Sequence, residues 1–219
     1  MKRELRLTED GSHTVYVNDL DEPYHSIHGA LQESRHVFIN QGFQKIAKSP
    51  LHILELGLGT GLNMMLTLVE AESLGLEVYY YAVEKYPLKS EEYFQLNHEQ
   101  VIEGLPFGSL VRMHEAPWDE QFQLSDTFFI HKEQADFRAM KPPGMFDLVY
   151  FDAFAPDKQP HLWSADIFEM LSHLVNPGGL VVSYTSKGSV RRALASNGFT
   201  VERVPGPPGK IEMIRATKR

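Results

Sequence analysis

The chain has 219 residues, of which 42% are hydrophobic and 23% charged, a composition typical of one globular domain with a small appendage. It has no cysteine, which excludes disulfides, thiolate metal sites and cysteine nucleophiles. No apolar run approaches the roughly 20 residues of a membrane span, and the first residues lack the apolar core of a signal peptide. We therefore expect a cytoplasmic protein without membrane contacts.

The net charge is −8, which argues against a general nucleic-acid binder. The charge is uneven, however, because residues 185–219 carry eight Lys or Arg and only two Glu. A basic end on an acidic body permits local contact with phosphates, although the same charges could simply be solvated. The histidines are scattered, so no metal site is predicted. His25 and His28, the closest pair, are assigned to the surface or a loop.

The first segment, residues 1–49, is predicted to be an N-terminal extension packed on a main domain of residues 50–219. Alternation over residues 14–17 indicates a small hairpin, which ends at residues 19–23. Residues 24–39 contain apolar positions at helical spacing, and Glu33 and Arg35 could be its solvated face.

Residues 51–63 are the stretch around which the rest is organised. An apolar strand over 53–56 breaks into Gly57, Gly59 and Gly61, and helix formers follow over 62–72. Glycines permit unusual backbone angles and let a ligand approach the chain closely. The ligand would meet N–H groups at a helix N-terminus. The spacing of the three glycines differs from the G-x-G-x-x-G of dinucleotide-binding folds, so an NAD-binding domain is the least favoured hypothesis.

A second predicted strand, residues 77–84, ends in Glu84. Ligands bind outside the carboxyl ends of strands in a doubly wound sheet, where such an acid can accept both ribose hydroxyls of a nucleoside. The alternative is an acid placed at a helix N-terminus by the dipole, since residues 85–87 are predicted to start the next helix.

The remaining pattern alternates strands with helices and predicts an α/β fold. Residues 97–126 are interpreted as mixed helix and loop. A continuous apolar strand over 146–152 ends in Asp152, and a loop with two prolines leads from it to Trp163. Other strands are predicted at 127–131 and 180–184, helices at 164–175 and 189–197, and a closing antiparallel hairpin at 199–204 and 211–216.

The pattern E-x-G-x-G-x-G resembles motif I of the class I S-adenosylmethionine-dependent methyltransferases, whose Rossmann-like sheet also closes with a hairpin. The sequence DAFAPxKxPxxW from Asp152, with the later PGG and SKGSVRRAL, resembles the methyltransferase half of the MnmC family, called MnmD when it stands alone. Glu33-Ser-Arg35 also matches, and the resemblance covers roughly residues 24–217. It implies transfer of a methyl group from S-adenosylmethionine to the exocyclic amine of 5-aminomethyl-2-thiouridine at the tRNA wobble position, giving 5-methylaminomethyl-2-thiouridine.

The resemblance also implies which residues hold the cofactor. For the adenine contact, relatives usually have Gly-Asp after the third strand, and the nearest match is Ala135-Asp136, which requires that strand to run on through Glu133. Gln134 is the alternative for this contact, because its side-chain carbonyl oxygen could accept the hydrogen bond instead. The cofactor residues so identified are Glu55, Gly57, Gly59, Gly61, Asn63, Glu84, Asp136 and Asp152.

Asp152 is the predicted catalytic residue, which would hold the substrate amine and accept its proton. It could instead only anchor its loop. Three apolar residues of this loop are predicted to line the pocket and exclude water, or to stack on the base: Phe154, Pro156 and Trp163. The alternative is that they only pack against the rest of the protein. The residues predicted to contact tRNA phosphates are Lys187, Arg191, Arg192 and, more weakly, Lys158.

Bifunctional relatives carry a flavin-dependent oxidase domain, and this sequence has no second dinucleotide motif. Oxidase activity is therefore expected to be absent, and a separate flavin oxidase could act upstream. Two other hypotheses stay open. One is a methyl or aminopropyl transferase acting on a small-molecule amine, and the other is a non-catalytic partner subunit that only binds S-adenosylmethionine.

Overall fold

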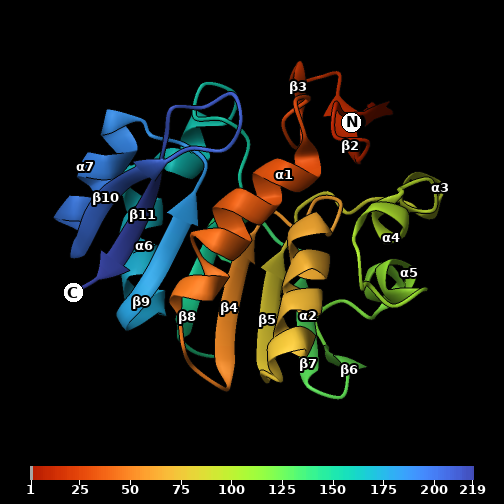
Figure 1. Cartoon of the computed structure of the whole chain (residues 1–219). Helices are drawn as coiled ribbons and strands as arrows, with labels where there is room; N and C mark the ends of the chain where they lie inside the picture. Colours follow the sequence, from red (N-terminus) through yellow and green to blue (C-terminus); the bar gives the residue numbers. More distant parts are fainter. Residues whose placement is uncertain (1) are drawn as a thin grey trace.

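The computed structural model describes residues 2–219, and its centre is one eight-stranded sheet (Figure 1). The strand order is β10-β11-β9-β8-β4-β5-β7-β6. The five strands from β9 to β7 are parallel to one another, and β6, β10 and β11 run antiparallel to their neighbours. The strands are β4 (Leu51–Leu56), β5 (Val78–Val83), β6 (Gln121–Ser125), β7 (Phe128–Glu133), β8 (Phe146–Phe151), β9 (Val175–Ser183), β10 (Phe199–Pro205) and β11 (Glu212–Lys218).

Helices cover both faces of this sheet, because side chains along each strand alternate between the two faces. In β4, Ile53 belongs to one core cluster, while Leu54 and Leu56 belong to the other. The first cluster lies under α1 (Ala30–Ser34), η1 (Arg35–Asn40) and α2 (Leu62–Leu74), and the second under α6 (Ala165–Leu174) and α7 (Gly188–Ser196). The shorter helices are η2 (Phe43–Lys45), α3 (Ser90–Tyr93), α4 (His98–Val101), α5 (Ser109–Glu115), η3 (Phe137–Ala139) and η4 (Pro160–Trp163).

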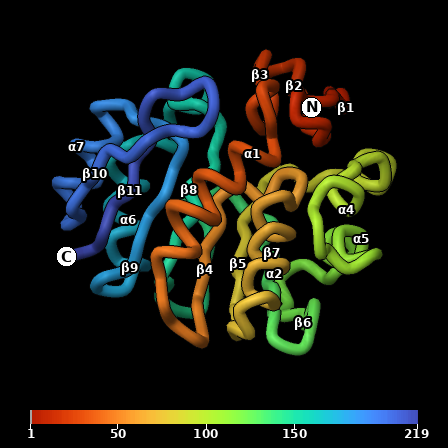
Figure 2. The backbone as a smooth tube through the Cα atoms, viewed as in Figure 1, coloured from red at the N-terminus to blue at the C-terminus, as the bar shows by residue number. Residues whose placement is uncertain are grey.

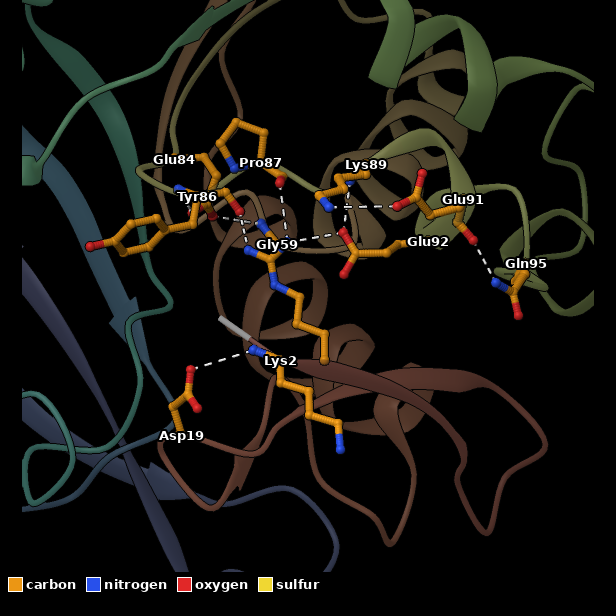
Figure 3. A network of polar contacts seen from close by, with 11 residues as sticks. Lys2, Asp19, Gly59, Glu84, Tyr86, Pro87, Lys89, Glu91, Glu92 and Gln95 are labelled. Carbon is orange, nitrogen blue, oxygen red and sulfur yellow. Dashed lines mark hydrogen bonds and ion pairs between the residues drawn. The ribbon is translucent and has the colours of Figure 1, made fainter.

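A separate three-stranded sheet, β1 (Arg3–Leu7), β2 (His13–Val17) and β3 (Glu22–Pro23), lies at the end of the main sheet where the parallel strands finish (Figures 1 and 2). The Arg3 guanidinium donates to the carbonyl of Tyr86, to the carbonyl of Pro87 at 3.1 Å and to Glu92 Oε2 at 3.0 Å. This sheet therefore holds the loop that follows β5, as Figure 3 shows.

The sequence analysis missed several elements. The N-terminal hairpin has a third strand, and β6 lies in a segment interpreted as mixed helix and loop. β9 begins at Val175, directly after α6, and so includes the Pro-Gly-Gly at which only a helix stop was predicted. The predicted helix over residues 24–39 begins only at Ala30 and continues from Arg35 as a π-helix.

No helix starts at residues 85–87, contrary to the prediction, and the first helix after β5 is α3. The reason is that this backbone is bound elsewhere: the Tyr86 N–H donates to Glu84 Oε1 at 2.8 Å, and the carbonyls of Tyr86 and Pro87 accept from Arg3. Among residues 2–219, no helix is long and apolar enough to cross a membrane.

Candidate active site

The glycine turn after β4 is closely packed. Gly57, Gly59 and Gly61 have φ values of 97°, 52° and 78°, a region that side chains rarely adopt. A Cβ on Gly57 would lie 2.7 Å from the carbonyl oxygen of Asp152, and one on Gly59 would lie 3.0 Å from the ring of Tyr24. Side chains at these positions would push apart β4, the Asp152 loop and the N-terminal segment. Gly61 is the N-cap of α2.

A cavity opens at this edge of the sheet. Six of the predicted site residues line it: Gly57, Gly59, Glu84, Asp136, Asp152 and Phe154. Glu55, Gly61 and Asn63 are not among the lining residues; Glu55 and Asn63 are buried directly behind Asp152.

Glu84 follows the last residue of β5 and connects that strand to the glycine turn. Its Oε2 accepts a hydrogen bond from the Gly59 N–H at 3.1 Å, and its Oε1 accepts from the Tyr86 N–H at 2.8 Å (Figure 3). The carboxylate is thereby fixed at the carboxyl end of the second strand, and it faces the cavity.

Asp136 is held by cations. Its carboxylate accepts from Lys85 Nζ at 3.1 Å and from Arg138 Nε at 3.0 Å, and the bonds from Arg138 keep the pKa of Asp136 well below its usual range. β7 runs through Glu133, as the assignment of Asp136 required, whereas Gln134 is exposed and does not line the cavity. Asp136 is thus an ionised acceptor that lines the cavity, and its assignment to the adenine contact stays a prediction.

Asp152 lies in a different environment. Asn63 Nδ2 donates both to Asp152 Oδ2 at 2.8 Å and to Glu55 Oε1 at 2.9 Å, so one amide joins the two acids. Glu55 is completely buried, and loss of water raises its pKa well above the usual value. The neutral form of Glu55 is therefore favoured, which limits the negative charge behind Asp152.

Burial also raises the pKa of Asp152, to about 7. The hydrogen bond from Asn63 opposes this rise, and the nearby Glu33 carboxylate adds to it. A carboxyl group with this pKa exchanges a proton near neutral pH, which is the property of a general base.

The loop after Asp152 has one side chain in the cavity and one in the core. Phe154 lines the cavity and meets the ring of Tyr24 edge-on, with centroids 5.3 Å apart. Trp163 is 8% exposed and packs on Phe151, and its indole N–H donates to the Phe154 carbonyl at 2.8 Å. Trp163 therefore fixes the loop without lining the cavity, and Pro156 does not line it either.

The four predicted phosphate contacts lie outside the cavity. Lys187 Nζ pairs with Asp157 Oδ2 at 2.5 Å, and Lys158 Nζ donates to the Asp21 carbonyl at 3.2 Å. Arg191 and Arg192 lie in the first turn of α7, and Arg192 is exposed. Two of these basic groups therefore lie on α7, Lys187 directly precedes it, and Lys158 lies in the loop after Asp152.

The N-terminal segment contributes residues that the sequence analysis missed. Tyr24 and His25 line the cavity. His25 was assigned to the surface or a loop; it does lie in the loop between β3 and α1, but its side chain is buried, and desolvation lowers its pKa to about 4. Glu33, interpreted as part of a solvated face, is also buried. No periodicity signals the placements of Tyr24 and His25, because they lie in the irregular chain between β3 and α1, whereas Glu33 is a buried residue of α1 itself.

The site fits S-adenosylmethionine. The glycine turn leaves no Cβ between backbone and ligand, and Glu84 and Asp136 offer carboxylate oxygens that can accept from hydroxyl and amino groups. Among residues 2–219, no group of three or more His, Asp or Glu side chains could hold a metal ion.

Comparison with known proteins agrees with this geometry. Residues 120–219 match the family described as S-adenosyl-L-methionine-dependent methyltransferase. The chain is 32% identical to the MnmC protein of Pseudomonas entomophila, described as a tRNA 5-methylaminomethyl-2-thiouridine biosynthesis bifunctional protein, over 89% of this chain and 32% of the relative. The corresponding protein of Pseudoalteromonas atlantica is 27% identical over 96% of this chain and 33% of its own length. The chain thus spans about a third of these relatives.

Among solved structures, the MnmC2 protein of Aquifex aeolicus superimposes with a TM-score of 0.78 at 27% identity, over 99% of this chain and 70% of that one. The spermidine synthase of Thermotoga maritima shares the fold, with a TM-score of 0.61 at 12% identity over 99% of this chain and 68% of that one. The matching family model and these relatives support a methyltransferase of the MnmD type, similar to part of the MnmC proteins, on the class I S-adenosyl-L-methionine-dependent methyltransferase fold.

Proposed function

We propose that this enzyme methylates the primary amine of 5-aminomethyl-2-thiouridine, or its form without sulfur, at the wobble position of tRNA. The product is the corresponding 5-methylaminomethyl nucleoside. The observation that carries the proposal is Asp152, a cavity carboxyl group with a pKa near 7 beside the glycine turn, in a chain related to MnmC proteins.

The chemistry requires little of the protein beyond alignment and proton removal. S-adenosylmethionine supplies a methyl group that is already activated on a sulfonium. A primary alkylamine is mostly protonated at neutral pH, and its nitrogen has no free lone pair in that state. We assign to Asp152 the role of holding this ammonium group and accepting its proton, directly or through water. Asn63 keeps the carboxyl group oriented.

The other site residues bind and exclude water. Glu84 and Asp136 accept hydrogen bonds from the cofactor, and the glycine turn admits it. Phe154 and Tyr24 close the apolar side of the cavity. Outside it, Arg191, Arg192 and Lys187 are proposed to contact tRNA phosphates, with Lys158 contributing less. A separate enzyme, such as a flavin oxidase, would supply the aminomethyl nucleoside.

The decisive experiment is transfer of labelled methyl from S-adenosylmethionine to tRNA isolated from cells that lack this enzyme, followed by nucleoside analysis. Label on 5-aminomethyluridine or its 2-thio form supports substrate, position and reaction together. Absence of label in every tRNA, with cofactor binding intact, would contradict the proposal. Incorporation into small amines without tRNA would then favour a small-molecule transferase.

A further inference from the structure

A lysine ammonium group lies beside the catalytic carboxyl group. Lys210, in the turn between β10 and β11, donates from Nζ to Glu33 Oε2 at 2.7 Å. The same nitrogen lies 4.1 Å from the centroid of the Tyr184 ring. A carboxylate together with an aromatic face is an arrangement that recognises ammonium groups in general.

The two groups that hold Lys210 are fixed. The Glu33 side chain is 9% exposed, and its second oxygen accepts from the Ser26 N–H at 3.1 Å. The Tyr184 hydroxyl donates to the Ala153 carbonyl at 2.8 Å, which ties the ring to the residue after Asp152. These contacts define a built site that remains if its cation leaves.

Lys210 itself is easier to move. Its side chain is 36% exposed, and hydrogen bonds from the Gly206 N–H to the Ile211 carbonyl at 3.1 Å and from the Lys210 N–H to the Pro207 carbonyl at 2.9 Å fix the turn backbone, so the side chain can move while the turn stays in place. Figure 2 shows this turn and α1 at the same end of the sheet. Rotation of the Lys210 side chain alone would free Glu33 and Tyr184 without disturbing the core.

The site borders the cavity on the Asp152 side. Ser26, which donates to Glu33, follows His25 of the cavity wall, and Ala153 lines the cavity. Glu33 and Lys210 are also close enough to Asp152 to act on it electrostatically, in opposite directions. An ammonium group held by Glu33 and Tyr184 would therefore lie next to the group that accepts its proton.

We propose that Glu33 and Tyr184 bind the primary ammonium group of the substrate, and that Lys210 occupies this position in the free enzyme until the substrate displaces it. The inference rests on the proposed function, because it takes an amine as the substrate. Glu33 draws in the charged amine, and the proton passes from its nitrogen to the Asp152 carboxylate. The freed lone pair would then form the N–C bond as the C–S bond of the sulfonium methyl donor breaks, with S-adenosylhomocysteine as the leaving group. Lys210 excludes other cations from the empty site.

Kinetics of tRNA methylation test the displacement. Lys210→Met removes the competing cation while keeping the length of the side chain, so the KM for tRNA should fall by about threefold to tenfold with kcat little changed. Arg203→Met is the matched control, because Arg203 lies in the same hairpin and pairs with Glu212 at 3.2 Å, away from Glu33. Its KM should stay the same. A rise in KM for Lys210→Met would overturn the proposal and indicate contact with RNA.

The binding site is tested with Glu33→Gln, which should raise the KM for tRNA about tenfold or more. In the double variant with Lys210→Met, the fall in KM caused by Lys210→Met should disappear. Cofactor binding by calorimetry confirms that each variant is folded. An unchanged KM in Glu33→Gln would overturn the site.

A second experiment tests the same site without tRNA. n-Propylammonium is titrated into the Lys210→Met variant and followed by NMR, and again with Glu33→Gln added. Binding that requires Glu33 supports the site even if no tRNA is methylated, in which case only the proposed function fails. Methylation of tRNA without any Glu33-dependent amine binding would reject the site and leave the function standing.

Discussion

Four acidic side chains lie at one edge of the sheet, and they form two pairs with opposite surroundings. Glu84 and Asp136 accept hydrogen bonds from backbone N–H groups, and Asp136 also accepts from the cations Lys85 and Arg138. Glu55 and Asp152 share one neutral amide donor, and Glu55 is completely buried while Asp152 is half-buried at the cavity wall. Pairing lowers the pKa of Asp136, whereas burial raises those of Glu55 and Asp152.

The difference separates binding from proton transfer. A carboxylate that stays ionised is a constant acceptor, which suits recognition of hydroxyl and amino groups. A carboxyl group that titrates near neutral pH can take up a proton and release it again. The chain therefore places hydrogen-bonded acceptors toward β5 and β7, of which Asp136 is kept ionised by its cations, and a titrating group at the end of β8.

The largest expected effect follows from replacing the titrating group. Asp152→Asn keeps the size of the side chain and an oxygen for Asn63, but it cannot accept a proton from the amine. We expect methyl transfer to fall by about 10² to 10⁴ fold. Affinity for S-adenosylmethionine, measured by calorimetry, should change little. Full activity in this variant would remove the assigned base.

The second effect concerns the fixed acceptors. Glu84→Ala removes the acceptor at the end of β5 and its bond to the glycine turn, so the Kd for S-adenosylmethionine should rise by about tenfold to a hundredfold. Activity at saturating cofactor should fall much less. Glu91→Ala on α3 is the control, because the exposed Glu91 pairs only loosely with Lys89, at 3.6 Å. An unchanged Kd in Glu84→Ala would contradict the assignment to cofactor binding.

The regular elements were largely predictable, and the wall of the cavity was not. Periodicity and the glycine turn identify the parallel sheet and place Glu84 and Asp152 at its carboxyl edge, because each acid directly follows an apolar strand. Tyr24 and His25 reach the same edge from an irregular segment whose path depends on tertiary contacts, such as the ring of Tyr24 against Gly59, and Glu33 reaches it from the short helix α1 that follows. The buried position of Trp163 likewise depends on Phe151 and Tyr184.

The third expected effect is on pH dependence. Because the pKa of Asp152 is raised to about 7, the free enzyme should gain activity as the pH rises through that value and the carboxylate forms. The measurement is kcat/KM for tRNA between pH 5.5 and pH 8.5, with cofactor saturating. A profile that is flat from pH 5.5 to pH 7.5 would show that Asp152 is ionised throughout, contrary to its buried position.

The smallest effect is on stability, and it has opposite signs in the two pairs. The folded pKa of Asp152 lies above its ordinary value of 3.8, so its stabilising contribution is complete below that value and is lost as the pH rises through about 7. The Asn side chain does not ionise, so Asp152→Asn does not lose this stability as the pH rises. The Tm of the variant minus the Tm of the parent should therefore increase by a few degrees from pH 4.5 to pH 8. The folded pKa of Asp136 is lowered, so its contribution is present above the ordinary value and disappears only in acid. Asp136→Asn should therefore lower the Tm by an amount that changes little between pH 4.5 and pH 8. If the Tm difference between Asp152→Asn and the parent also stayed constant over that range, the two acids would not differ in the way their surroundings imply.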